Sequence, residues 1–275
     1  TFPQLGAPIG LFVANATFFL VSYFWGQQAL VEWAWRIPFI SSLALVLVGL
    51  YVRLTLHESH VFIEAEEKGK KLKAPVRVVF TKHFKPMVIG TFIMVATYSL
   101  FYIMTAFAQA YSRTPATLSE AGYPMGLGIP ANTFTGLLLM SAIVFAIFIS
   151  ISGLYADKIG RRKWLIWTTV SILIFALCMP LFLGNGTPTS VFAFLVIGMA
   201  LMGMTFGPMA ALLPELFPTE VRYSGASLAY NIASIIGATI AAMISLKINA
   251  LYGLMGVGIY LAINAFLTLL ALLAS

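Results

Sequence analysis

Long stretches without a charged residue alternate with short polar stretches along the whole chain. The uncharged runs cover residues 1–31, 37–52, 86–112, 121–156, 164–214, 223–246 and 248–275. Within them the apolar residues follow one another without the alternation of a half-buried strand, which excludes a membrane β-barrel. A helix that crosses a bilayer needs about 20 such residues. The pattern therefore predicts an all-α, polytopic membrane protein.

Glycines, prolines and polar clusters divide these runs into eight predicted transmembrane helices. The clearest divisions are Gly122–Pro130, Gly184–Pro188, Pro214–Pro218 and Asn249–Gly253. The predicted helices are Leu5–Trp25, Trp35–Leu56, Phe84–Tyr111, Asn132–Leu154, Trp164–Leu183, Ser190–Leu213, Ser224–Lys247 and Leu251–Ala274. Most connections are short, so we expect neighbouring helices to run antiparallel.

The positions of Lys and Arg predict which side of the membrane each loop faces. Most of them lie after the second, fourth and sixth predicted helices, in residues 53–85, in residues 158–163 and at Arg222. Arg36, Arg113 and Lys247 fall on the opposite side. Because cytoplasmic loops are enriched in Lys and Arg, we expect both chain ends and the loop 57–83 on the cytoplasmic side of the membrane.

Composition supports this class and excludes several others. The chain is 60% hydrophobic and 9% charged, whereas about a quarter of the residues of a soluble domain are charged. The loop cations explain the net charge of +7, so we expect no nucleic-acid partner. A single cysteine excludes a disulfide framework, and His57–His60 lacks the spacing of a zinc-peptidase helix. We therefore expect no metal, no cofactor and no catalytic residue.

One short loop, between the fourth and fifth predicted helices, combines glycines, an acid and several bases. Its sequence is Gly153-Leu-Tyr-Ala-Asp157-Lys-Ile-Gly160-Arg161-Arg162-Lys163. Gly153 permits close approach of helices and Gly160 permits a sharp turn. A loop that merely sets orientation needs the bases but no acid at this spacing. Two interpretations stay open: a gate at the cytoplasmic side, or stabilisation of the loop itself.

Three further blocks are Pro3–Gly10, Trp33–Phe39 and Pro214–Ser227. The loop motif, Gly-x-x-x-Asp-x-x-Gly-Arg-Arg between two membrane helices, resembles the cytoplasmic signature of the major facilitator superfamily, in its second-half copy. Together with the three blocks, it resembles the metabolite:proton symporter family, whose members carry shikimate, 2-oxoglutarate, citrate or proline and betaine. The resemblance covers essentially the whole chain, which looks like helices five to twelve of a twelve-helix (6+6) fold.

The resemblance implies three parts of the chain. Residues 1–56 would be the last two helices of an N-terminal six-helix bundle, residues 57–83 the cytoplasmic loop between bundles, and residues 84–275 a C-terminal six-helix bundle. The implied function is secondary active transport: proton-coupled uptake of a small polar metabolite, an organic acid or a zwitterion, by alternating access. The expected partners are this small molecule, protons and membrane lipid, and the complete protein is expected to be a monomer. The resemblance also implies the inner membrane of a bacterium as the location.

The resemblance also implies roles for charged residues at the cytoplasmic gate. On closure, Asp157 would meet the start of the first helix here, near Gly6. Arg161 and Glu215 would form a charge relay, with Arg222 nearby. The gate prediction thus comprises Gly153, Asp157, Gly160, Arg161, Arg162, Glu215 and Arg222.

Polar side chains at membrane depth usually face the interior of a helix bundle. Tyr98, Tyr102, Thr105 and Gln109 recur at spacings that place them on one stripe of a helix. Tyr230 and Asn231 add polar groups in the seventh predicted helix. We predict that these six residues line a substrate path. The alternative is that the hydroxyls bond carbonyl groups one turn earlier and the tyrosines merely pack.

The middle of each predicted helix lacks Asp, Glu, His, Lys and Arg. A proton-coupled carrier needs a titratable group near its path, so we do not expect this chain by itself to couple transport to protons. An enzyme is not expected, because the helices hold no catalytic set at depth. An uncoupled facilitator or channel and a structural scaffold remain as alternatives to the symporter.

Overall fold

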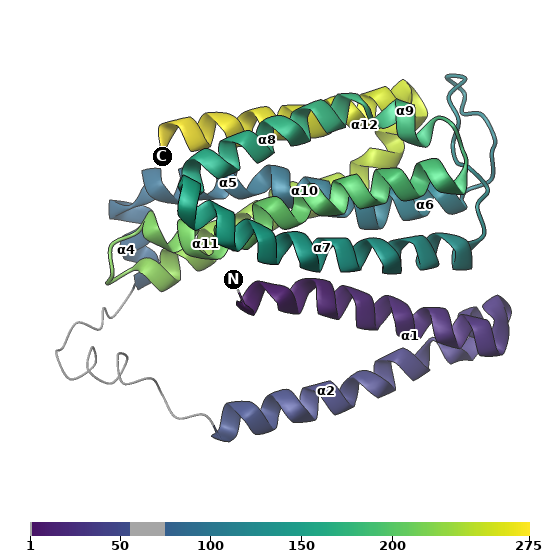
Figure 1. The fold of residues 1–275 in the computed structure, drawn as a ribbon, viewed down its shortest axis with the longest axis horizontal. Helices are drawn as coiled ribbons and strands as arrows, with labels where there is room; N and C mark the ends of the chain where they lie inside the picture. Colours follow the sequence, from purple (N-terminus) through teal and green to yellow (C-terminus); the bar gives the residue numbers. More distant parts are fainter. Residues whose placement is uncertain (1, 56–74) are drawn as a thin grey trace.

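Helices build nearly all of the chain that the computed structural model describes, residues 2–55 and 75–275 (Figure 1). In order they are α1 (Gly6–Ala29), α2 (Arg36–Thr55), α4 (Pro75–Lys82), α5 (Phe84–Tyr102), α6 (Ala108–Arg113), α7 (Ala131–Ile159), α8 (Arg161–Leu177), α9 (Met179–Leu183), α10 (Pro188–Glu215), α11 (Arg222–Ser234) and α12 (Ile240–Ala274). π-Helical turns at Leu30–Ala34, Ile103–Phe107 and Ile235–Thr239 follow α1, α5 and α11. Within these described ranges, β-structure is limited to an isolated bridge between Leu118 and Pro124.

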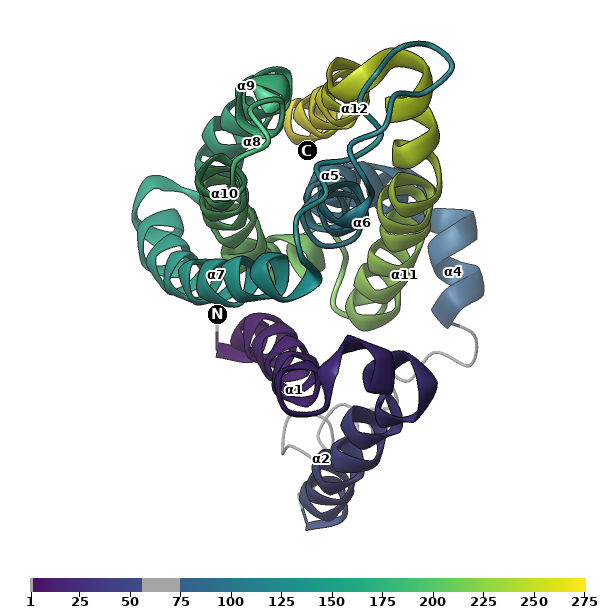
Figure 2. The same ribbon diagram turned by 90° about the vertical axis from the view of Figure 1, so that its right-hand side faces the viewer.

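Six continuous helical stretches of the described chain are long and apolar enough to cross a membrane. They are Gly6–Ala34, Arg36–Thr55, Phe84–Arg113, Ala131–Ile159, Pro188–Glu215 and Arg222–Ala274. The last has 53 residues, which at about 1.5 Å per residue would measure about 80 Å, far more than a hydrocarbon core of about 30 Å. Gly253, with φ 68° and ψ −171°, breaks this stretch, and Figure 2 shows α12 divided into two arms.

The remaining predicted span corresponds to α8 and α9. α8 has 17 residues and continues through a turn at Cys178 into α9. With the break at Gly253, the described helices therefore match the eight predicted segments in order, with ends shifted by several residues. The chain is an all-helical, polytopic membrane protein, as the sequence predicted.

The part of the predicted loop 57–83 that the structure describes contains a helix. Residues 75–82 form the helix α4, because Val79 is fully buried among side chains of α5 and α11 in one of the two apolar clusters. Residues 57–74, which include His57–His60, lie outside the described residues.

Two clusters of buried apolar side chains hold α5 to α12 together. The larger cluster gathers phenylalanines from several helices, among them Phe107, Phe134, Phe145 and Phe194. The smaller cluster joins α4, α5, α10 and α11 near one end of the bundle. α5 contributes to both clusters, and Figure 2 shows it inside the ring of neighbouring helices.

Glycines allow α7 and α10 to approach closely. A Cβ atom built on Gly203 would lie 2.7 Å from Cβ of Phe148, and one on Gly207 would lie 2.0 Å from Oγ of Ser152. The Ser152 hydroxyl also donates across this interface to the Gly203 carbonyl oxygen at 3.0 Å. Small residues on α10 thus fix its contact with α7.

α1 and α2 lie to one side of the other helices (Figure 1). α1 packs along α7, and α2 packs against α1. Most of the large apolar side chains of α2 are exposed, from Phe39 to Leu54. Such a surface suits contact with lipid or with other membrane helices rather than water.

Candidate functional site

The turn between α7 and α8 positions the first group of predicted site residues. Gly160 adopts φ 100° and ψ 122°, a conformation that residues with a Cβ atom disfavour. Its N–H donates to the Ala156 carbonyl at 3.0 Å, and α8 begins with the next residue. Asp157 therefore lies in the last turn of α7, with the buried Gly153 one turn earlier, and Arg161 lies in the first turn of α8.

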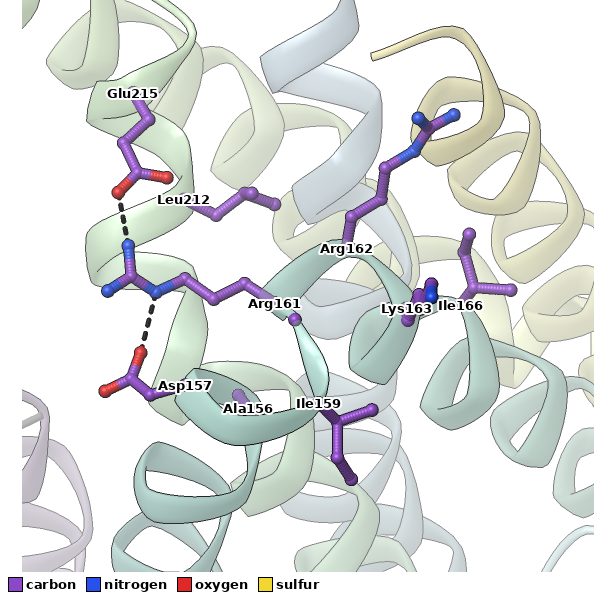
Figure 3. A pocket seen from close by; sticks show the side chains of 10 residues that line it. Ala156, Asp157, Ile159, Arg161, Arg162, Lys163, Ile166, Leu212 and Glu215 are labelled. Atoms are coloured by element: carbon purple, nitrogen blue, oxygen red, sulfur yellow. Dashed lines mark hydrogen bonds and ion pairs between the residues drawn. The ribbon is translucent and has the colours of Figure 1, made fainter.

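Arg161 connects this turn to the end of α10 (Figure 3). Its Nε donates to Oδ1 of Asp157 at 2.9 Å, and its Nη1 donates to Oε1 of Glu215. The side chains of Asp157 and Glu215 are 61% and 56% exposed. The hydrogen bond to Asp157 and the nearby Glu215 raise the pKa of Arg161 above its ordinary value, so the guanidinium stays charged. We call Asp157, Arg161 and Glu215 the Arg161 cluster; an open pocket of about 710 Å³ adjoins it.

The other two predicted gate arginines have different partners. Arg162 points away from the Arg161 cluster (Figure 3), and its Nε and Nη2 donate to the carbonyl oxygens of Leu272 and Leu273, each at 2.7 Å. These carbonyls lie in the last turn of α12, where helix acceptors lack partners within the helix. Arg222 Nε donates to the Phe217 carbonyl at 3.3 Å. The contacts thus join Arg161 with Glu215, whereas Arg222 bonds within its own segment.

Asp157 and the start of α1 form no hydrogen bond with each other in the described chain. The Gly6 position is open, because nothing lies within 4 Å of a Cβ atom built there. The contact that the family resemblance implies on closure is therefore not made in this arrangement.

The predicted polar stripe does share one face of the helix. Tyr98, Tyr102, Thr105 and Gln109 are all partly exposed, while most residues between them are buried. The ring of Tyr98 meets that of Tyr230 edge to face, with centroids 5.7 Å apart. At about 1.5 Å per residue, the stripe extends for about 16 Å along the helix, which is too long for a single contact site.

Three of the six predicted path residues make local hydrogen bonds. One is Gln109, whose amide nitrogen donates to the Thr105 carbonyl at 3.1 Å when its amide oxygen faces Arg113. The Thr105 hydroxyl donates to the Phe101 carbonyl at 2.8 Å, and the Asn231 side chain donates to the Ser227 carbonyl at 2.8 Å. These bonds match the alternative interpretation, in which polar side chains bond the preceding turn. Asn231, Tyr230 and Arg222 nevertheless line an open pocket of about 610 Å³ at the start of α11.

Gln109 belongs to a second polar site, which the sequence pattern did not reveal. Arg113 Nη2 donates to the Thr135 hydroxyl at 3.2 Å. With its amide oxygen toward the guanidinium, Gln109 accepts from Nη2 of Arg113 at 3.0 Å and from Nη1 at 3.1 Å. Across the same pocket, Ser22 and Gln27 of α1 each donate to Oδ1 of Asn132 at 2.8 Å.

This second site is a pocket of about 410 Å³ between α1, α6 and α7. We call it the Arg113 pocket. Asn132 lies in the first turn of α7 and Asp157 in its last, so about 38 Å of helix separates the pocket from the Arg161 cluster. Gln109 and Arg113 are four residues apart on one helical face, a signal that could have revealed the pair had Arg113 not been assigned to a loop.

A metal site requires several ligating side chains that lie close together. Within 2–55 and 75–275, no group of three or more His, Cys, Asp and Glu side chains is placed to hold a metal ion. Cys178 is a free, partly buried thiol.

Comparisons with known proteins agree on one kind of relative. The family model of the Major Facilitator Superfamily matches residues 2–242. A Haemophilus influenzae protein named for metabolite transport is 86% identical over 275 residues, which are 100% of this chain and 63% of the relative. The inner membrane metabolite transport protein YhjE of Escherichia coli is 52% identical over 275 residues, 99% of this chain and 61% of the relative.

A more distant relative has a named substrate. The proline/betaine transporter of Salmonella typhimurium is 27% identical over 278 residues, 97% of this chain and 53% of the relative. No solved structure matches the chain. The chain spans less than two-thirds of the length of each of these three relatives.

Proposed function

Because this chain belongs to the Major Facilitator Superfamily, we propose that it forms part of a secondary transporter for a small polar metabolite. The superfamily comprises transporters and not enzymes, and the relatives are named as transport proteins. The name of the Escherichia coli relative places that protein in the inner membrane, and we propose the same membrane here, with both chain ends and loop 57–83 in the cytoplasm. The mechanism we propose is alternating access, in which two helix bundles move about a central path.

The division into bundles that we propose follows the packing of the helices. α1 and α2 would belong to one bundle, and α5 to α12 to the other, with residues 57–83 between them. This division is supported by the two clusters of buried apolar side chains, which are built from residues of α4 to α12. A few partly buried residues at the start of the chain pack against the larger cluster. α2 contributes a largely exposed apolar surface, which further helices of the same bundle would cover in the complete protein.

The observation that carries the gate proposal is the position of Arg161 between Asp157 and Glu215. The contacts join the ends of α7 and α10 through a turn that Gly160 makes possible. Both acids are more than half exposed, and exposed ion pairs contribute about 0–1 kcal/mol to stability. An acid–base–acid arrangement is therefore not needed to hold the fold, and a role in a gate explains its presence.

The proposed path runs along the polar stripe from Tyr98 in α5 to Gln109 in α6. The edge-to-face pair of Tyr98 and Tyr230 brings α5 and α11 together in its course, and phenol groups serve a polar solute as donors and acceptors. For the substrate class we propose an organic acid or a zwitterion, as the proline/betaine transporter among the relatives suggests.

Uptake coupled to protons is part of the proposal. The carboxylates among the described residues lie at helix ends or in loops, namely Glu32, Glu120, Asp157, Glu215 and Glu220. We therefore assign the proton site to no residue of this chain. An uncoupled facilitator is the second candidate, and the same absence of a buried carboxylate in the described spans favours it.

The gate is tested with Asp157→Asn in the full-length transporter. Uptake of radiolabelled proline, glycine betaine and a panel of organic acids is measured in cells, with membrane protein levels quantified. We expect uptake to fall by about tenfold, which corresponds to about 1.4 kcal/mol of lost stabilisation of the closed gate. Glu120→Gln, an exposed carboxylate in the loop before α7, is the matched control and should transport normally.

Two outcomes would overturn parts of the proposal. Unchanged uptake by Asp157→Asn at normal membrane levels would refute the gate and favour loop stabilisation. Accumulation that a protonophore does not reduce would refute proton symport and leave facilitated diffusion or another coupling ion.

A further inference from the structure

The Arg113 pocket contains a cation whose partners are neutral. In this structure Arg113 bonds the Thr135 hydroxyl and the Gln109 amide oxygen. Among the described residues, the ion pairs are those of Arg161 with Asp157 and Glu215, so no described carboxylate neutralises Arg113. A guanidinium has five N–H donors, and its Nε has no acceptor in the described chain. In the part of the chain that the structure describes, the Arg113 guanidinium therefore keeps an uncompensated positive charge and a free N–H donor that an anionic ligand could use.

Asn132 adds donors of the same kind to this pocket. Its Oδ1 accepts hydrogen bonds from both Ser22 and Gln27. Its amide nitrogen, in contrast, has no acceptor among the residues that the structure describes. Amide and guanidinium N–H groups that share a pocket are complementary to the two oxygens of a carboxylate.

Size and charge narrow the class of ligand. The pocket volume of about 410 Å³ falls within the range of about 300–1,000 Å³ that is usual for small-molecule sites. Arg113 is the charged member of its lining. One guanidinium matches the single charge of a carboxylate better than the double charge of a phosphate.

The position of the pocket connects it with transport. Its lining comes mainly from α1, α6 and α7, and it lies at the end of α7 opposite the Arg161 cluster. Gln109 of α6 is the last member of the polar stripe that begins in α5 and continues through the π-helical turn, so the pocket adjoins one end of the proposed path. We propose that the Arg113 pocket binds the carboxylate group of the transported metabolite at the mouth opposite the Arg161 cluster. This inference rests on the proposed function and specifies its substrate class.

Binding to the purified full-length transporter in lipid nanodiscs tests the inference. The probes are propionate, succinate, proline and glycine betaine, each compared with its uncharged or carboxyl-blocked amide, and inorganic phosphate. We expect at least one carboxylate to bind and its amide to bind far more weakly. Arg113→Gln should lower the carboxylate affinity by about tenfold to a hundredfold, as loss of a charged hydrogen-bonding partner does.

Two further variants separate the role of Arg113 from its effect on folding. Gln109→Glu places a carboxylate against the guanidinium, so it should compete with the ligand and lower affinity while the arginine stays in place. Arg36→Gln is the matched control. Arg36 stacks on the ring of Trp35 at 4.6 Å at the same end of the molecule, outside the pocket, and its loss should leave affinity unchanged.

Specific results would overturn the inference. One is that each acid and its amide bind with equal affinity. Others are that phosphate binds while the carboxylates do not, or that no carboxylate binds. The last is that Arg113→Gln and Arg36→Gln bind the carboxylate with equal affinity. Failure of the proposed function looks different. If cells take up an uncharged solute and Asp157→Asn blocks it, transport stands and the carboxylate site falls. If no solute is taken up, the proposed function falls as well.

Discussion

Replacing Gly207 of α10 by alanine tests whether the α7–α10 contact is fixed by backbone approach. A Cβ atom at this position would lie 2.0 Å from Oγ of Ser152 and 2.8 Å from the carbonyl oxygen of Ile149. The Ser152 side chain can rotate away, but it then gives up its 3.0 Å hydrogen bond to the Gly203 carbonyl. The Ile149 carbonyl belongs to the backbone of α7, so the two helices themselves must separate.

The expected magnitude follows from three contributions. Overpacking of a filled interface costs about 1–3 kcal/mol, and loss of the buried hydrogen bond costs about 1 kcal/mol more. Alanine is the better helix former and returns about 1 kcal/mol. We therefore expect Gly207→Ala to lower the free energy of unfolding by about 1–3 kcal/mol.

The assay is reversible unfolding of the full-length protein in mixed micelles, followed by intrinsic tryptophan fluorescence. Gly49→Ala in α2 is the matched control, because nothing lies within 4 Å of a Cβ atom there, and it should be neutral or stabilising by up to about 1 kcal/mol. Ser152→Ala combined with Gly207→Ala should recover part of the loss by removing the shorter of the two contacts. Equal stabilities of Gly207→Ala and Gly49→Ala would refute the reasoning.

Two further substitutions probe other contacts in the same unfolding assay. Thr268→Val removes a hydroxyl that donates to the Phe92 carbonyl at 2.6 Å and accepts from the Ala96 N–H at 3.1 Å, so we expect a loss of about 1–2 kcal/mol. The matched control is Thr17→Val, because the exposed Thr17 hydroxyl donates to a carbonyl of its own helix. It should change stability by less than about 0.5 kcal/mol. Equal losses of stability in Thr268→Val and Thr17→Val would show that the Thr268 hydrogen bonds to α5 do not stabilise the fold. Gly160→Ala forces φ 100° on a residue with a Cβ atom and should cost about 1–2 kcal/mol; an unchanged unfolding free energy would show that the turn relaxes.

Hydropathy predicted the helices because lipid imposes a strong and local requirement on each segment. An uncharged run of sufficient length must be helical whatever it packs against, so all eight predicted segments have a helical counterpart. The break at Asn249–Gly253 was also local, since it depends on one glycine with positive φ. The packing of α4 against the bundle was less accessible, because the burial of Val79 depends on other helices that its own short sequence does not reveal.

The candidate sites were less accessible because their partners are distant in sequence. In the sequence, Arg162 has the position of a loop cation. The carbonyl groups that accept its hydrogen bonds lie 110 and 111 residues away, at the end of α12. In the sequence, Arg113 has the position of a charge in an outer loop, but it donates a hydrogen bond to Thr135 of α7. The Arg161–Asp157 contact was the easier one, since four residues separate the two side chains. A charge pattern thus locates a polar residue along the membrane normal, but it does not identify the helix that it faces.

The two interfaces of α7 differ in the way that the proposed motion requires. At the interface between α7 and α10, a Cβ atom added to Gly207 of α10 would overlap atoms of α7. At the interface between α7 and α1, a Cβ atom added to Gly136 of α7 would lie at an ordinary contact distance of 4.0 Å from the ring of Phe19. The start of the chain is joined to α10 by a 3.3 Å bond from Gln4 to a backbone carbonyl, and α1 is joined to α7 by bonds to Asn132. Each such hydrogen bond contributes about 0.5–1.5 kcal/mol net and reforms with water or lipid headgroups when it breaks. Movement of α1 along α7 therefore exchanges a few hydrogen bonds, whereas movement between α7 and α10 would disrupt close packing. We expect α1 and α7 to form the moving boundary of the transport cycle, with α7 and α10 travelling as one body.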